Sequence, residues 1–112
     1  MASEMITIIR GSTPTHYYRL PFEYNGVVKN IKITYLQHKP TSDITIEKDE
    51  NDIQITGDMI YFILTAVETN SFETGRIVTI QIDITTFDDI VLVSDTYKMQ
   101  VTDNIEEEVG EA

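Results

Sequence analysis

The residues best suited to acid–base chemistry in this sequence are two histidines, His16 and His38. Ser12, His16 and Asp43 supply the residue types of a nucleophilic triad, in which histidine takes the proton of a serine hydroxyl. The nucleophile turn G-x-S-x-G that would expose such a serine is absent, and nothing in the spacing brings the three residues together. We therefore predict that both histidines are ordinary strand residues and that the protein is not an enzyme.

Carboxylates are concentrated at residues 49–52 and at the pair Asp88-Asp89. Oxygen ligands of this kind suit Ca²⁺, but neither cluster follows the EF-hand pattern D-x-[DN]-x-[DN]-G. The sequence has no cysteine and no H-E-x-x-H zinc motif. We expect solvated turns at both places and no metal or cofactor, while weak Ca²⁺ binding at these turns stays open.

Six tyrosines remain as residues that could bind a partner. Tyrosine is favoured at interfaces because it is amphipathic and has few torsions to immobilise. Tyr17 and Tyr18 are adjacent, so on a strand they point to opposite sides. We predict that one of them is exposed or lies in a subunit contact.

The elements that must position these residues are strands. The chain has 17 Ile and 8 Val against 4 Leu and 3 Ala, and branching at the β-carbon favours a pleated sheet over a helix. Apolar and polar residues alternate in several segments, which predicts half-buried strands. These segments are 31–35, 44–47, 53–56, 78–85 and 97–101.

Two segments depart from this alternation because they are apolar throughout. Residues 59–64 and 90–93 are hydrophobic or aromatic at every position, so we predict that both faces of each strand are covered. The alternation changes phase at Ser94-Asp95. Such a change indicates either a bulge or a strand that crosses between sheets.

Turn and cap residues separate the strands. Turns are expected at Asn25-Gly26, at 56–58, at 49–52 as a hairpin tip, and at Asp88-Asp89 as a hairpin between the two longest strands. In LTAVETNSF, Thr65 and Glu68 have the spacing of a capping box, which predicts one short helix.

The segment RGSTPTHYYRLPF, residues 10–22, predicts a strand, a corner and a second strand. The first strand ends at Arg10-Gly11, and Pro14 forms the corner because it has no amide hydrogen to donate. The second strand covers residues 15–20. His16, Tyr18 and Leu20 should share one face, and Tyr17 and Arg19 the other.

These elements predict an all-β protein, an immunoglobulin-like antiparallel β-sandwich of about seven or eight strands with one short helix. A small barrel is the alternative. We assign residues 1–102 to a single sandwich domain and residues 103–112 to an acidic C-terminal tail.

The net charge of −11 argues against direct nucleic-acid binding, which needs clustered Lys and Arg. No apolar run is long enough for a membrane span, and the N-terminal residues lack a basic signal region, so export is not expected. Five of the nineteen acids lie in residues 103–112. This tail is either solvated or a docking segment, with Ile105 and Val109 spaced to pack on a partner.

Five segments carry a further pattern: RGSTPTHYYRLPF, NIKITYLQHK, LTAVETNSF, GRIVTIQIDITTFDD and VSDTYKMQVTD. In this order they resemble a family of small tail-module proteins of phages and prophages of Gram-positive bacteria. That family is similar to the N-terminal domain of baseplate upper proteins and begins with R-G-x-T-P-T. The chain departs from the pattern where Asp88-Asp89 replaces a turn glycine and where Asp83 replaces an arginine common in the family.

The resemblance implies a structural protein of the virion, assembled in the host cytoplasm, that contacts other tail or baseplate proteins or further copies of itself. The candidate interface residues are Arg10, Thr13, Pro14, Tyr17, Tyr18, Arg19, Ile105 and Val109. Lys29, Lys32 and Glu47 are expected to guard sheet edges. The alternative is an acidic inhibitor that mimics nucleic acid. It requires acids gathered on one face, whereas an adaptor requires dispersed acids and an exposed apolar patch. A carbohydrate-binding module is weaker, because the sequence has no tryptophan.

Overall fold

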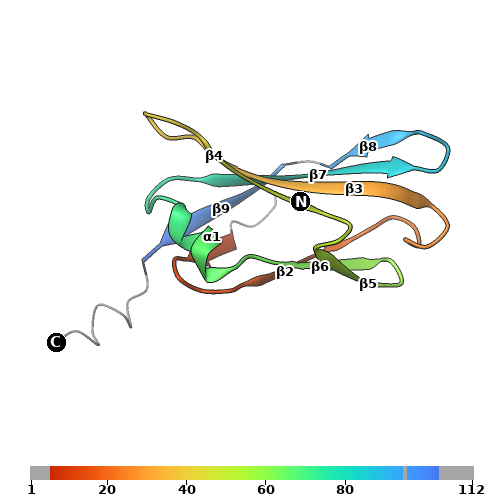
Figure 1. Cartoon of the computed structure of the whole chain (residues 1–112), viewed down its shortest axis with the longest axis horizontal. Coiled ribbons are helices and arrows are strands. Elements are labelled where there is room, and N and C mark those ends of the chain that lie inside the picture. The colour runs from red at the N-terminus through yellow and green to blue at the C-terminus, as the bar shows by residue number, and fades with distance from the viewer. Residues whose placement is uncertain (1–5, 95, 104–112) are drawn as a thin grey trace.

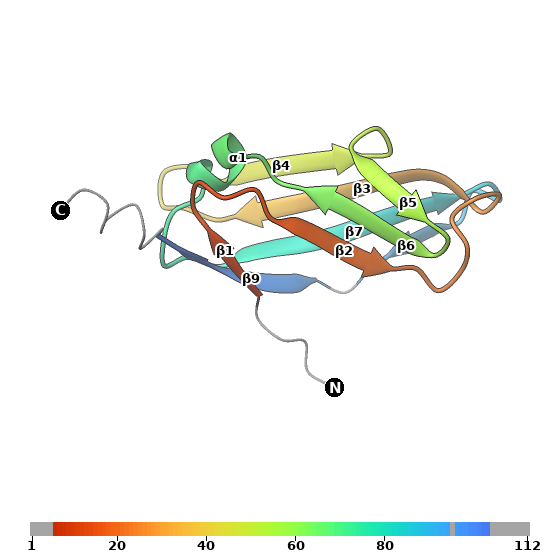
Figure 2. The ribbon, with the colours of Figure 1, turned by 90° about the horizontal axis from the view of Figure 1, so that it is seen from below.

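The computed structural model describes residues 6–94 and 96–103, which form two β-sheets packed face to face (Figures 1 and 2). The described residues contain nine strands and one helix. The six-stranded sheet has the order β1 (Ile6–Ile9), β9 (Tyr97–Thr102), β7 (Val78–Thr86), β3 (Val28–Gln37), β4 (Ile44–Asp49), and β8 (Val91–Val93) also pairs with β7. The three-stranded sheet has the order β2 (Thr15–Arg19), β6 (Met59–Ile63), β5 (Ile53–Thr56). The helix, α1, spans Ala66–Ser71.

This strand order confirms the predicted immunoglobulin-like sandwich. The three-stranded sheet β2-β6-β5 corresponds to immunoglobulin strands B-E-D. The strands β9-β7-β3-β4 of the other sheet correspond to G-F-C-C′. Strand pairing among the described residues stays within each sheet, so the barrel alternative is wrong. The sandwich is not wholly antiparallel, because β1 pairs with β9 in parallel.

The core is built from the alternation that the sequence shows. Every second residue of β7 is buried, and Tyr35 of β3 is fully buried between the sheets. The rings of Tyr35, Phe62 and His16 meet between the two sheets, with centroids 5.8 to 6.3 Å apart. Burial of apolar side chains between the sheets is the main stabilising contribution to such a fold.

The two apolar segments are not covered on both faces, so that prediction is wrong. β6 alternates, with Ile60 and Phe62 buried and Ile63 49% exposed. In β8 all three residues are exposed. The reason is that the sequence shows how hydrophobic a strand is but not where the strand lies in the sheet. Among the described strands, β8 has only β7 beside it, at the end of the sandwich.

The phase change after residue 93 coincides with a register shift within one sheet, so a crossing between sheets is excluded. β8 pairs with β7 through Ile84 and Leu92, whereas β9 pairs with β7 through Thr79 and Lys98, and the register shifts by one residue between them. Ser94 bridges the irregularity, because its hydroxyl accepts the Ile82 N–H at 3.0 Å. Both strands stay in one sheet.

The turn at residues 49–52 is real but it is not a hairpin tip. Its two strands, β4 and β5, belong to different sheets, so the turn carries the chain across the sandwich. Asp49 Oδ1 accepts the Asn51 N–H at 2.9 Å, which fixes the turn. The turns at 25–26 and 56–58 are confirmed.

The hairpin at 88–89 is confirmed, with Asp89 at φ 62° and a bond from Thr86 N–H to the Ile90 carbonyl. It does not join the two longest strands, because β8 has only three residues.

The segment 10–22 folds as a strand, a corner and a strand. β1 ends at Ile9, and Gly11 turns the chain with φ 82°. β2 ends at Arg19 rather than at residue 20. The predicted faces are confirmed, because His16 and Leu20 are buried whereas Tyr17 is 69% exposed.

Candidate protein-binding surfaces

The residues that suggested a triad have separate partners. Tyr35 Oη lies 2.6 Å from His16 Nδ1 inside the core, and His38 Nδ1 lies 3.0 Å from Asp43 Oδ1 at the surface. The Ser12 hydroxyl donates to the carbonyl of Ile9. Burial lowers the pKa of His16, so its ring is neutral near pH 7. The structure therefore brings none of these side chains into a nucleophile–base pair.

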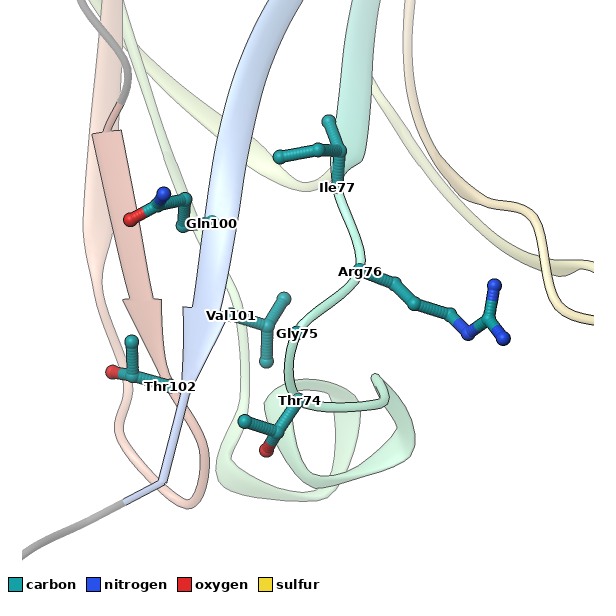
Figure 3. Close-up of a pocket in the computed structure, with 7 residues that line it drawn as sticks. All are labelled: Thr74, Gly75, Arg76, Ile77, Gln100, Val101 and Thr102. Carbon is teal, nitrogen blue, oxygen red and sulfur yellow. The ribbon is translucent and has the colours of Figure 1, made fainter.

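Two further features of the described residues bear on ligand binding. Among residues 6–94 and 96–103, no three His, Asp or Glu side chains gather in a group that could hold a metal ion. A shallow hollow of about 280 Å³ lies between residues 74–77 and the end of β9, and Figure 3 shows the Arg76 side chain pointing away from β9. The guanidinium of Arg76 pairs with Glu73 instead, at 2.7 Å. The hollow thus offers no charged group to a ligand.

Arg10, a predicted interface residue, is used inside the molecule. Its guanidinium donates to the Asn70 carbonyl at the end of α1 and pairs with Asp103, which follows β9. The bonds from Thr74 and Arg10 hold the pKa of Asp103 below its usual range. Asp103, assigned to the tail, is therefore attached to the sandwich, and Arg10 joins three chain segments at this end.

The end of the sandwich that holds α1 is closed by polar contacts. The predicted capping box is present, with Thr65 Oγ1 accepting the Glu68 N–H and Glu68 Oε1 accepting the Thr65 N–H. Gln37 is fully buried, and its amide accepts the Glu73 N–H while donating to the carbonyls of Glu73 and Arg76. We call this end the helix end.

Lys48 and Glu68 form the most buried ion pair described at the helix end. Lys48 Nζ lies 2.7 and 2.8 Å from the two Glu68 carboxylate oxygens, and the Lys48 side chain is almost buried. Burial raises the pKa of Glu68, but bonds from Lys48 and Thr65 and the charge of Lys48 outweigh it, so the net shift is downward. The pair anchors α1 to β4, and no sequence pattern had indicated it.

The outer face of β2 and β6 carries aromatic and aliphatic side chains. Tyr17 and Tyr61 are cross-strand neighbours with ring centroids 6.4 Å apart, and exposed Ile63 lies beside them opposite Thr15. Arg19 is on the same face, 3.3 Å from Asp58. We call this surface the tyrosine face. It contains Tyr17 and Arg19 from the predicted interface.

The other predicted interface residues are placed differently. Tyr18 points inward, half-buried, with its ring edge-on to Tyr97 at 5.9 Å. Thr13 is exposed at the corner, and the Pro14 carbonyl accepts the Leu64 N–H. Ile105 and Val109 lie outside the described residues.

The largest exposed apolar run lies on the hairpin between β7 and β8, which we call the apolar hairpin. Phe87 is 61% exposed, and the four residues of 90–93 range from 38% to 62% exposed. It lies at the opposite end of the molecule from α1 (Figure 1). Consecutive exposed apolar residues on a soluble domain indicate a contact surface. The sequence carries this signal in IVLV, but the same composition is typical of a buried strand.

The apolar hairpin is held in place by its neighbours. The Phe87 N–H donates to the Val27 carbonyl at 3.0 Å, and Lys29 pairs with Asp89 at 3.2 Å. These contacts tie the hairpin to the last loop residue before β3 and to the start of β3. A surface that is already ordered loses less conformational entropy when a partner binds.

Charged residues are dispersed over the described part of the chain. Six of the eight Lys and Arg have a carboxylate within 4.0 Å. The outer face of the six-stranded sheet mixes Lys32 and Lys98 with Glu47 and Asp83, and no outward strand position of the described three-stranded sheet is acidic. Glu47 is on edge strand β4 as expected, but Lys29 and Lys32 are on β3, an interior strand.

A scan against models of protein families and a search among curated proteins both find no match to this chain. Within the described part of the chain, no helix is long and apolar enough to cross a membrane.

Proposed function

We propose that this protein is a non-enzymatic structural protein of a phage tail or baseplate and that it acts by binding neighbouring proteins in the virion. The observation that carries the proposal is the apolar hairpin, in which Phe87 and residues 90–93 are exposed together at one end of an ordered sandwich. The order of sequence segments that resembles phage tail-module proteins supports the assignment to a phage.

The distribution of charge supports an adaptor over an acidic inhibitor. An inhibitor that mimics nucleic acid needs a continuous acidic face, because its target site is built for phosphates. Here the strand acids of the described residues are interspersed with Lys32 and Lys98, and other acids lie at turns at both ends. An apolar contact surface with a polar rim is typical of protein–protein interfaces.

Mass spectrometry of purified virions from the phage that encodes this chain tests the proposal. The protein should be detected in particles at a fixed ratio to a known tail protein, and the ratio should persist after a high-salt wash because the proposed contact is apolar. If the protein is absent from virions and binds a soluble host enzyme instead, the inhibitor is the correct assignment.

A further inference from the structure

Among the described residues, β2 is an edge strand of the three-stranded sheet. In immunoglobulin constant-type domains a strand A lies beside strand B in this sheet. Here β2 corresponds to strand B, and the first described strand, β1, lies beside β9 in the other sheet. Figure 2 shows β2 with β6 along one side. Among the described residues the position on the other side of β2 has no strand.

The backbone groups at this edge can be assigned from the ladder. Bonds from Leu20 N–H to the Asp58 carbonyl and from Leu64 N–H to the Pro14 carbonyl mark the bonded pairs between β2 and β6. Bonded and non-bonded pairs alternate along antiparallel strands. The N–H and C=O groups of Thr15, Tyr17 and Arg19 therefore point away from β6, toward the open edge.

A groove of about 480 Å³ runs along this edge, between β2 and the strands of the opposite sheet. A cavity of about 150 Å³ accommodates a group the size of benzene, so the groove has room for roughly three side chains. Besides the β2 residues, its walls are Phe62, Ile80, Ile82, Tyr97 and Met99. Among the described residues Arg19 is the one charged residue that lines it, and its guanidinium pairs with Asp58 at 3.3 Å, so an occupant should present uncharged side chains.

His16 adds a second indication of an occupant. It lines the groove, is 9% exposed, and its Nε2 has no hydrogen-bond partner among the described residues. Tyr35 Oη contacts the other ring nitrogen, Nδ1, at 2.6 Å. Among the described residues Nε2 is therefore a buried polar atom without a partner, a donor in one tautomer of the ring and an acceptor in the other. A backbone amide or carbonyl group, or a hydroxyl group, in the groove would satisfy it.

We infer that β2 accepts an additional strand from a partner protein, an extended segment with apolar side chains at alternate positions that fill the groove. Backbone bonds to Thr15, Tyr17 and Arg19 give affinity, and the alternate side chains give selectivity. The inference rests on the proposed function, because it supplies the mode by which a neighbouring protein in the virion is bound. It concerns a surface separate from the apolar hairpin.

Titration of the isolated full chain with a synthetic peptide of about nine alternating valine and threonine residues tests this inference. NMR should show downfield shifts of the amide protons of Thr15, Tyr17 and Arg19, and their exchange with solvent should slow by roughly tenfold or more. Ile53 and Ile55 have the corresponding outward amides on β5, the other edge of the same sheet, and should not change.

Backbone and side-chain contributions are separated by variants. Tyr17→Pro removes the central outward amide without breaking a bond to β6, and should weaken binding roughly tenfold. Tyr17→Ala keeps this amide and should bind nearly as well, and Ile55→Pro is the matched control on β5. The same peptide with N-methyl groups on alternate amides facing β2 should not bind.

Three results overturn strand addition at β2. The first is no shift with millimolar peptide, and the second is equal shifts at the two edges. The third is strong exchange protection of Thr15, Tyr17 and Arg19 before peptide is added, because the edge is then already occupied. Protection that rises with protein concentration would identify a second copy as the occupant, and protection independent of concentration would identify residues 1–5. The titration uses no phage particles, so its failure leaves detection in virions unaffected, and absence from virions leaves the titration unaffected.

Discussion

The two ends of the sandwich are built on opposite principles. At the helix end, the buried polar groups of Gln37 and Lys48 bind the loop after α1 and α1 itself to the strands. At the other end, the apolar hairpin exposes five aliphatic or aromatic side chains, although its backbone is held by Val27 and Lys29. A polar group that is buried with all its partners stabilises one arrangement of the chain, whereas exposed apolar surface contributes little until a partner covers it.

The difference therefore separates residues that determine stability from residues that determine binding. Substitutions at the helix end should lower the free energy of unfolding. Substitutions at the apolar hairpin should leave it nearly unchanged and reduce binding instead.

The largest effect is expected for Gln37→Leu. The variant leaves the Glu73 N–H and the Glu73 and Arg76 carbonyls without their side-chain partner. These bonds are part-buried, and each lost bond should cost about 1 kcal/mol, so urea denaturation should show a loss of about 3 kcal/mol. Gln81→Leu is the matched control, because Gln81 is on the outer face of β7 and bonds only Asp83 among the contacts described.

A loss for Gln37→Leu no larger than that for Gln81→Leu would contradict the assignment of the helix end as the stabilising one. It would mean that residues 73–76 rearrange freely and that their contacts with β3 contribute little.

The next effect is expected for Lys48→Met and depends on pH. Near pH 7 the variant leaves the partly buried Glu68 carboxylate without its cation, which should cost about 2 kcal/mol. The folded-state pKa of Glu68 lies below its ordinary value of 4.5. The pair's contribution is therefore complete above pH 4.5 and is lost as the pH falls through the lower folded-state value.

Urea denaturation near pH 7 and about pH 3 measures this dependence. The difference between the wild type and Lys48→Met should narrow at the lower pH, because the fraction of Glu68 that is protonated rises as the pH falls. Lys32→Met removes the exposed pair with Glu47, whose atoms are 3.9 Å apart, and should change stability by less than about 0.5 kcal/mol. A Lys48→Met difference that is constant with pH would show that Lys48 acts by packing alone.

The sequence predicted most of the fold because alternation and turn chemistry are local. The strand around Val78–Thr86, the Thr65–Glu68 capping box and the division of Tyr17 from Tyr18 all follow from spacing along the chain. The pairing of Lys48 with Glu68 could not be predicted, because it joins residues 20 positions apart whose proximity depends on the tertiary fold.

The candidate surfaces were harder to predict than the fold. Residues 90–93 have the composition of a buried strand, and only the position of β8 at the end of its sheet leaves them exposed. Arginine is a residue type common at protein interfaces, yet Arg10 binds Asn70 and Asp103 within the chain. Whether a side chain is exposed depends on which strands and loops pack beside it in the fold. The composition of a short segment does not give that information.

The smallest effect on stability is expected at the apolar hairpin. Val91 and Val93 are 62% and 56% exposed, so Val91→Thr and Val93→Thr should each change the free energy of unfolding by less than about 0.5 kcal/mol. Val78→Thr makes the same change at a fully buried position and should cost about 2 kcal/mol. Thermal or urea denaturation of the three variants measures this contrast.

The most direct test of the adaptor proposal is the incorporation of the Val91→Thr/Val93→Thr double variant into virions, measured by quantitative mass spectrometry against a known tail protein. The control is Val67→Thr, an exposed valine on α1 at the opposite end of the molecule. The proposal predicts that the double variant folds like the wild type but is incorporated about tenfold less, which corresponds to about 1.4 kcal/mol of binding, while Val67→Thr is incorporated normally. Equal incorporation of both variants would contradict the proposal that the apolar hairpin is the contact surface.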